Sequence, residues 1–146
     1  MPDDNGNARP ARSFWVISAA ALVWNLIGVA SYLMTVTISA ETLNAMPVAE
    51  RSLYQGIPAW VTSSYALAVF GGTLASALLL ARRAGAVSAF YVSLLAIIVQ
   101  MTHTLFMSAI AKVRGPAAAA LPVAIIIVAV YLLWYSRSAR ARGWLR

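Results

Sequence analysis

Five polar or aromatic side chains stand in or beside long apolar stretches of the sequence, where they could form a charge-free binding site. They are Asn25, Tyr32, Trp60, Gln100 and His103. Amide, hydroxyl and imidazole groups donate and accept hydrogen bonds, and aromatic rings present flat apolar faces. Such groups can hold the hydroxyls and ring faces of sugars and polyols without any charge. The set therefore predicts the binding of a small neutral solute.

The residues that catalysis or metal binding would need are missing. The chain has no cysteine and one histidine, so neither a thiolate site nor a pair of histidines can hold a metal. The sequence shows no paired carboxylates in an apolar stretch, no Ser-His-Asp set and no glycine-rich phosphate loop. Proton-coupled carriers commonly use a carboxylate inside the membrane, and none is present there. We expect no enzyme, no metal, no cofactor and no ion pump.

The composition indicates a membrane protein. Hydrophobic residues make up 62% of the 146 residues and charged residues only 10%, whereas a soluble domain has about 25% charged residues. The surface must then be largely apolar, as a lipid bilayer requires. The net charge of +7 does not predict nucleic-acid binding, because the arginines lie at the ends of the apolar stretches, where they set membrane topology.

Four stretches are long enough for a membrane helix, which needs roughly 20 mostly apolar residues. None contains Asp, Glu, Lys or Arg, and they span residues 14–37, 59–81, 87–111 and 117–135. The first is longer than the apolar region of about 7–15 residues in a signal peptide, so we expect it to stay uncleaved. The fold class is an all-α membrane protein with four transmembrane helices.

The connections follow from these spans. The basic residues favour cytoplasmic termini in a bacterial inner membrane, because eight of the eleven lie on the side of the two termini. We expect a disordered cytoplasmic tail, an outer loop, a cytoplasmic turn, an outer turn and a basic cytoplasmic tail, at residues 1–13, 38–58, 82–86, 112–116 and 136–146.

The outer loop should contain a short amphipathic helix over residues 47–55. Pro47 suits its first turn, and Glu50 places a negative charge near the positive end of the helix dipole. Gly56 suits the position after the helix, and Pro58 blocks its continuation. Tyr54 of this helix could then lie over the outer end of the bundle.

The polar residues of the first span admit two interpretations. Ser18, Asn25 and Tyr32 are seven residues apart, almost two helical turns, so they share one side of the helix with Gly28. Lipid offers no hydrogen-bond partner, so this side should face protein or water. Asn25 could bond to a neighbouring helix, as polar side chains in bundles often do, or it could line a solute pocket. We favour packing for Asn25.

The second and third spans carry different signals. A small residue at every fourth position of the second span, Ser64, Ala68, Gly72 and Ser76, predicts close approach to another helix. The partner is either the first span or a second protomer. In the third span, Gln100 and His103 share one face. With Tyr32 and Trp60 at similar depth, they would line an outer-facing pocket; alternatively, the two aromatic residues belong to an interfacial belt and His103 is structural.

Three segments also resemble a family of small four-span bacterial membrane proteins whose members are often labelled "sugar transporter". The segments are VWNLIGVASYLMT, YQGIPAWV and VFGGTLASALLLARR. The similarity covers roughly spans one to three. The residues on which it rests are Trp24, Asn25, Gly28, Tyr32, Gly56, Pro58, Ala59 and Trp60. The resemblance implies the four-span architecture and agrees with a neutral solute, but it implies no residue roles.

Two functions remain open at this point. One is a carrier or binder of a small neutral solute such as a sugar or polyol. The alternative is a non-catalytic accessory or assembly subunit of a larger membrane complex, which would use the small-residue face of the second span. Four helices leave little room for a lined route, so a carrier of this size is expected to form a homo-oligomer.

Overall fold

Four helices long and apolar enough to cross a membrane run side by side in the computed structural model, which describes residues 9–146. They are α1 (Arg12–Val36), α4 (Ala59–Leu80), α5 (Gly85–Thr102), extended by a π-helical turn (His103–Met107), and α7 (Ala120–Ala141), preceded by a 3₁₀ turn (Pro116–Ala119). The described part of the chain contains no strand. The prediction of an all-helical protein with four long apolar helices is confirmed.

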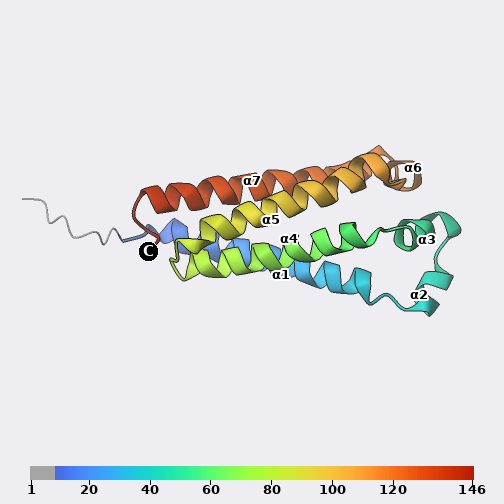
Figure 1. Ribbon diagram of the computed structural model, residues 1–146, viewed down its shortest axis with the longest axis horizontal. Helices are drawn as coiled ribbons and strands as arrows, with labels where there is room; N and C mark the ends of the chain where they lie inside the picture. The colour runs from blue at the N-terminus through green and yellow to red at the C-terminus, as the bar shows by residue number, and fades with distance from the viewer. Residues whose placement is uncertain (1–8) are drawn as a thin grey trace, which may run out of the picture.

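Three short helices gather at one end of the bundle, here called the loop end: α2 (Ala40–Ala45), α3 (Val48–Gln55) and α6 (Ile110–Arg114) (Figure 1). α3 follows Pro47 and stops before Gly56, close to the predicted residues 47–55. α2 was not predicted. Its start is capped by Ser39, whose hydroxyl accepts a hydrogen bond from the Thr42 N–H at 3.1 Å.

Several boundaries differ from the sequence analysis. α1 starts at Arg12, inside the predicted tail of residues 1–13, whose first eight residues lie outside the described part. The third span was expected to reach residue 111, but its helix ends at Met107, before Ser108, which has an extended backbone. α6 then covers residues 110–114 and overlaps the turn expected at 112–116. α7 continues beyond residue 135 to Ala141, through a segment rich in Arg and Ala, which are strong helix formers.

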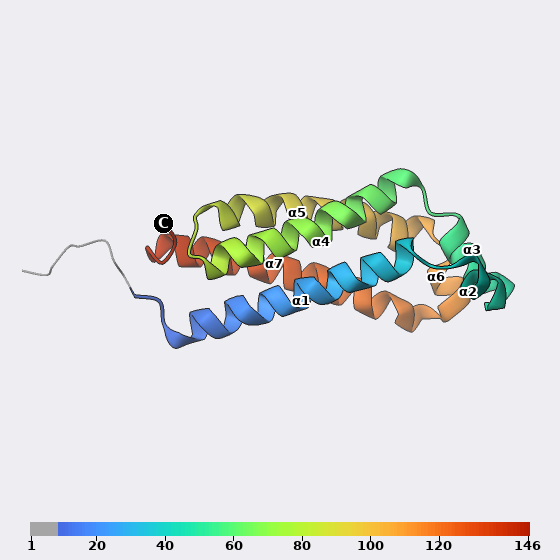
Figure 2. The same ribbon diagram turned by 90° about the horizontal axis from the view of Figure 1, so that it is seen from below.

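The long helices pack in chain order and leave one side open. α4 lies between α1 and α5, and α7 packs along α5, whereas α1 and α7 barely touch over the described residues. Figures 1 and 2 show α1 and α7 on the same side of the α4–α5 pair, separated along much of their length. The bundle is therefore a square of helices with one seam that is not closed by direct helix packing.

At the other end, here called the terminal end, aromatic rings close this seam. Phe14 is completely buried. Its ring centroid lies 6.5 Å from that of Tyr135 in α7 and 5.7 Å from that of Trp144 in the C-terminal segment. These three residues are called the aromatic cluster below, and they lie on a core that includes Leu79 and Leu132.

The last residues of the chain pair with the turn between α4 and α5. The Arg146 N–H donates to the Arg82 carbonyl and the Ala84 N–H donates to the Arg146 carbonyl, both at 2.7 Å. The Arg82 guanidinium also donates from Nε to the Trp144 carbonyl at 2.8 Å. These bonds hold the C-terminal segment, with buried Leu145, against the bundle.

Candidate functional site

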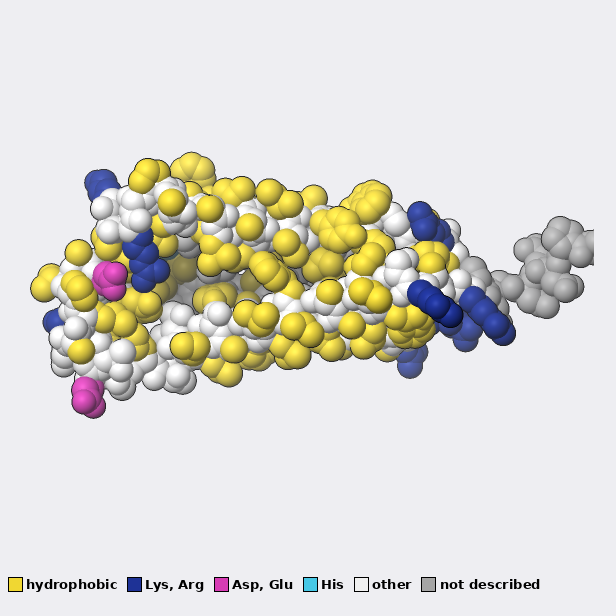
Figure 3. Space-filling view, turned by 180° about the vertical axis from the view of Figure 1, so that it is seen from behind, with side chains coloured by type: hydrophobic (Ala, Val, Ile, Leu, Met, Phe, Trp, Pro, Cys, Tyr) yellow, Lys and Arg dark blue, Asp and Glu magenta, His cyan; other side chains and the backbone are white. Residues whose placement is uncertain are grey.

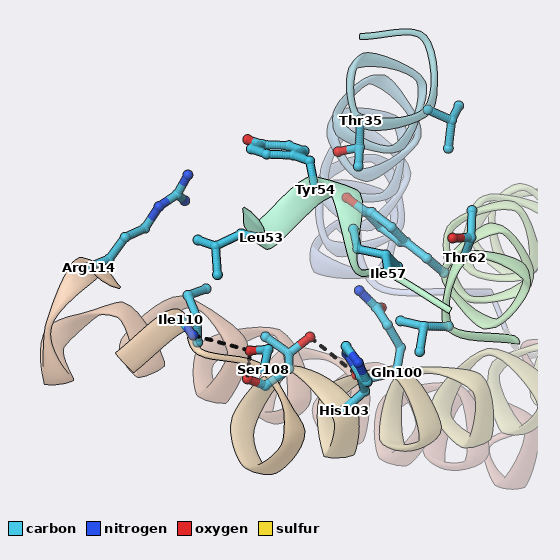
Figure 4. Close-up of a pocket in the computed structure, with 14 residues that line it drawn as sticks. Thr35, Leu53, Tyr54, Ile57, Thr62, Gln100, His103, Ser108, Ile110 and Arg114 are labelled. Atoms are coloured by element: carbon cyan, nitrogen blue, oxygen red, sulfur yellow. Dashed lines mark hydrogen bonds between the residues drawn. The ribbon is translucent and has the colours of Figure 1, made fainter. Parts of the chain in front are cut away.

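A pocket of about 200 Å³ lies at the loop end, between the ends of the long helices and the short helices above them. Figure 4 shows side chains from α1, α3, α4, α5 and α6 around it. It is called the loop-end pocket here, and its lining consists of Thr35, Val36, Leu53, Tyr54, Ile57, Val61, Thr62, Tyr65, Gln100, His103, Thr104, Ser108, Ile110 and Arg114.

The π-helical turn supplies the polar wall of this pocket. The Ser108 N–H donates to the His103 carbonyl at 2.8 Å, the i to i+5 bond that widens the helix by one residue. His103, Thr104 and Ser108 thereby line the pocket together with Gln100. Such turns occur frequently at functional sites.

Several polar groups at this pocket have no hydrogen-bond partner within the described part of the chain. The hydroxyls of Thr104 and Ser108 donate to backbone carbonyls one turn earlier. By contrast, no described residue forms a hydrogen bond with the side-chain amide of Gln100, the imidazole of His103 or the hydroxyl of Tyr65. These groups remain available to water or to a ligand.

Two of the predicted site residues support the pocket from outside its lining. The Trp60 ring meets the His103 ring edge-on, with centroids 5.6 Å apart. The Tyr32 ring packs edge-on against Tyr65 at 5.3 Å and against Phe70 at 5.9 Å. Trp60 and Tyr32 therefore orient His103 and Tyr65, which do line the pocket.

The lining also includes polar residues that were not predicted as site residues, among them Thr35, Thr62, Tyr65, Ser108 and Arg114. Thr62 and Tyr65 are three residues apart in the second span, on one helical face, so this signal was present in the sequence. Arg114 was interpreted only as a topology residue. It makes the lining positively charged at one point, and the residues that line the pocket include no Asp or Glu.

A second cavity of about 280 Å³ runs along the open seam and is lined by residues of all four long helices. It is called the α1–α7 groove here. Figure 3 shows the surface hollowed between the upper and lower helices on this face. Asn25, Ser93 and Gln100 are among its polar lining residues, and Tyr65 and Gln100 line both this groove and the loop-end pocket.

Asn25 takes part in hydrogen bonds within the bundle. Its Nδ2 donates to the Ala21 carbonyl at 2.9 Å and across to the Ser76 hydroxyl of α4 at 3.1 Å. The Ser76 hydroxyl donates in turn to the Gly72 carbonyl at 2.8 Å. Both N–H groups of the amide are therefore bonded within the protein, although Asn25 also lines the groove.

The small-residue face of α4 is covered within the chain. Ala68, Gly72 and Ser76 are buried. α5 contacts this face through the Ser93 hydroxyl, which donates to the Ala68 carbonyl at 2.7 Å, and α1 contacts it through Asn25. The fourth member, Ser64, is half-buried, and its hydroxyl donates to the Trp60 carbonyl of its own helix.

Gly28 belongs to the same contact between α1 and α4. A β-carbon at this position would lie 3.2 Å from Cγ1 of Val69, which is tight. The close packing that the small residues predicted is thus made within one protomer.

No protein-family model, curated protein or solved structure matches this chain. The resemblance to the small four-span family therefore stays a prediction. Among the described residues, no group of three or more His, Asp or Glu side chains could hold a metal ion.

Proposed function

We propose that this multi-pass membrane protein binds a small neutral, hydroxyl-bearing solute in the loop-end pocket. The observation that carries the proposal is the set of polar groups without a bond to the described residues, Gln100, His103 and Tyr65, around one cavity. A few converging polar groups on a largely apolar wall are typical of a small-molecule site. The pocket volume of about 200 Å³ is below the roughly 300–1,000 Å³ of pockets for drug-sized ligands, so the pocket suits a smaller solute.

The polar groups suit hydroxyls better than ions. The Gln100 amide both donates and accepts, as does a neutral imidazole, so each can match a hydroxyl group in either direction. The Tyr54 ring borders the same space and offers an apolar surface. Arg114 could also attract a carboxylate, so small organic acids are the competing class of ligand.

Binding from the loop end fits this conformation better than passage through the bundle. The terminal end is filled by the aromatic cluster, in which Phe14 is completely buried. A carrier would have to separate Phe14 from Trp144 and Tyr135 during its cycle. We therefore propose that the protein binds the solute from the accessible loop end, rather than transporting it through the bundle.

We also propose that the loop end faces the periplasm of a bacterial inner membrane. Lys and Arg side chains lie at both ends of the bundle (Figure 3). Eight of the eleven, all of them arginines, belong to the terminal end, as the positive-inside rule expects on the cytoplasmic side. Reporter fusions after Arg51 and after Arg146 test this orientation. A periplasmic signal after Arg146 would contradict it.

The alternative, an accessory subunit of a larger membrane complex, would need a free surface for its partner. The small-residue face suggested for that role is covered by α1 and α5. An accessory subunit would have to use a different surface, so we prefer the solute function.

A thermal-shift series tests the proposal. The purified protein, in mild detergent, is heated with and without a panel of sugars, polyols and small carboxylic acids. We expect a neutral compound to raise the melting temperature of the wild type, and Gln100→Leu and His103→Ala to reduce that rise. Gln55→Leu is the matched control, because Gln55 is exposed and lies outside the pocket lining. If no compound stabilises the wild type, the proposal fails.

A further inference from the structure

The α1–α7 groove opens sideways, because α1 and α7 do not pack against each other along the seam. At this depth the medium beside the protein is lipid rather than water. Most of the wall is apolar and includes Ile27, Leu94, Ile97 and Ile125. The ligand chemistry that fits such a wall is a hydrocarbon chain.

The length of the groove corresponds to one leaflet. Its lining on α5 runs from Met101 to Phe90, and eleven residue steps at about 1.5 Å each give about 16 Å. The hydrocarbon core of a bilayer is about 30 Å thick, so the groove spans about half of it. Phe90 and Leu132, at the deep end, belong to the buried core. The groove therefore fits a single chain that enters from the leaflet at the loop end.

The polar groups of the groove determine which way round a bound hydrocarbon chain would lie. At the deep end, the amide N–H groups of Asn25 and the hydroxyl of Ser93 donate to protein acceptors. At the shallow end, the side-chain amide of Gln100 has no partner among the described residues, and it also lines the loop-end pocket. A polar head is thus accommodated next to Gln100, and an apolar tail towards Phe90.

We propose that the ligand is an amphiphilic lipid with one apolar chain in the α1–α7 groove and a small uncharged polyol head in the loop-end pocket. It enters from the bilayer between α1 and α7. This inference rests on the proposed function, because the head uses the polar groups assigned there to the solute. The inference adds an apolar hydrocarbon chain to the ligand, which a soluble sugar or polyol lacks.

Photo-crosslinking in phosphatidylcholine nanodiscs tests the proposal. The probe is a monoacylglycerol with a diazirine in mid-chain, and the labelled residues are identified by mass spectrometry. We expect labelling of groove residues that an excess of unlabelled monoacylglycerol abolishes. We expect Ala129→Phe, which fills the groove from α7, and Ser31→Phe, which fills it from α1, to lose that labelling. Ala30→Phe is the control, because Ala30 is exposed outside the groove.

The role of the head is tested with a diazirine-labelled alkane of the same chain length. We expect the alkane to label the groove less than the monoacylglycerol, and Gln100→Leu to weaken monoacylglycerol labelling about two- to tenfold, as the loss of one hydrogen bond implies. Equal labelling by both probes, or labelling that neither groove variant changes, would overturn the proposal.

The two proposals can fail separately. If soluble sugars or polyols stabilise the protein but the groove is not labelled competitively, the lipid inference is wrong and the pocket function stands. If monoacylglycerol labels the groove and depends on Gln100 while no soluble compound binds, the lipid inference holds and the soluble-solute function is wrong.

Discussion

The amide oxygen of Asn25 lies directly against the backbone of Gly72, so a β-carbon at residue 72 would overlap with it. The same β-carbon would lie 3.1 Å from the Ser93 hydroxyl. Three helices therefore meet at one glycine: α1 through Asn25, α4 through Gly72 and α5 through Ser93. This contact holds the walls of the groove at a fixed separation.

Gly72→Ala should destabilise the protein by about 1–3 kcal/mol, the range for overpacking a tight core. Gly71→Ala is the matched control, because a β-carbon there would make only ordinary contacts of 3.6 Å with the Ser93 side chain. Alanine also favours the helix, so this control should be neutral or slightly stabilising. The measurement is the thermal stability of both variants in the same detergent. Equal stability would show that α1 is not held against Gly72.

The hydrogen bond between Asn25 and Ser76 should contribute measurably to stability. A double-mutant cycle with Asn25→Ala, Ser76→Ala and the double variant isolates the pair. We expect a coupling energy of about 0.6 kcal/mol, the mean for such bonds in a membrane protein, and no more than about 1.7 kcal/mol. Additive effects of the two substitutions would mean that the amide does not link α1 to α4.

The sequence predicts the number of long helices but not how they end. Lengths and apolarity of the four stretches are sufficient for the first conclusion, because a membrane span needs both. The apolar stretch around His103 continues to residue 111, so nothing in its composition marks the π-helical turn or the break at Ser108. That break depends on how the α5 end packs under α3 and α6, which is tertiary information.

The candidate site was predictable only in part. Gln100 and His103 share one helical face, and both line the loop-end pocket. The contribution of Arg114 depends on α6, a short helix that was not predicted and that overlaps the expected turn at 112–116. The open seam between α1 and α7 has no signature in α7, because the groove-facing positions of that helix are as apolar as lipid-facing ones. Asn25 marks a protein-facing side of α1 but does not show that α7 stays apart from it. The groove is visible only once the helices are placed.

Arg82 is expected to carry a backbone cost that glycine would remove. Its φ of 59° lies in the left-handed region, at the position after α4 where the Arg83 N–H donates to the Leu78 carbonyl and the Arg82 N–H donates to the Leu79 carbonyl. This is the Schellman arrangement, in which glycine is usual. A left-handed conformation costs an L-residue roughly 1–2 kcal/mol.

Arg82→Gly should therefore be more stable than Arg82→Ala by about 1 kcal/mol. Both variants lose the side-chain bond to the Trp144 carbonyl, so their difference isolates the backbone. The measurement is thermal unfolding of the two variants in parallel. If Arg82→Ala is as stable as Arg82→Gly, the left-handed conformation is not maintained in the folded protein.

Phe14 should be a main determinant of stability at the terminal end. Its ring is completely buried and contacts Tyr135 of α7 and Trp144 of the C-terminal segment. Replacing a buried Phe by Ala typically costs about 3–5 kcal/mol. Phe14→Ala should accordingly lower the melting temperature strongly and increase proteolysis at the C-terminal segment, because that segment rests on the ring.

Phe106→Ala is the matched control, because it makes the same chemical change at a side chain that is 82% exposed. This side chain contacts lipid rather than the core of the bundle. We expect little loss of stability from it. A comparable loss from both variants would mean that the aromatic cluster does not hold α1 to α7. In that case the seam would be open at the terminal end as well, and the groove would not be closed there by Phe14.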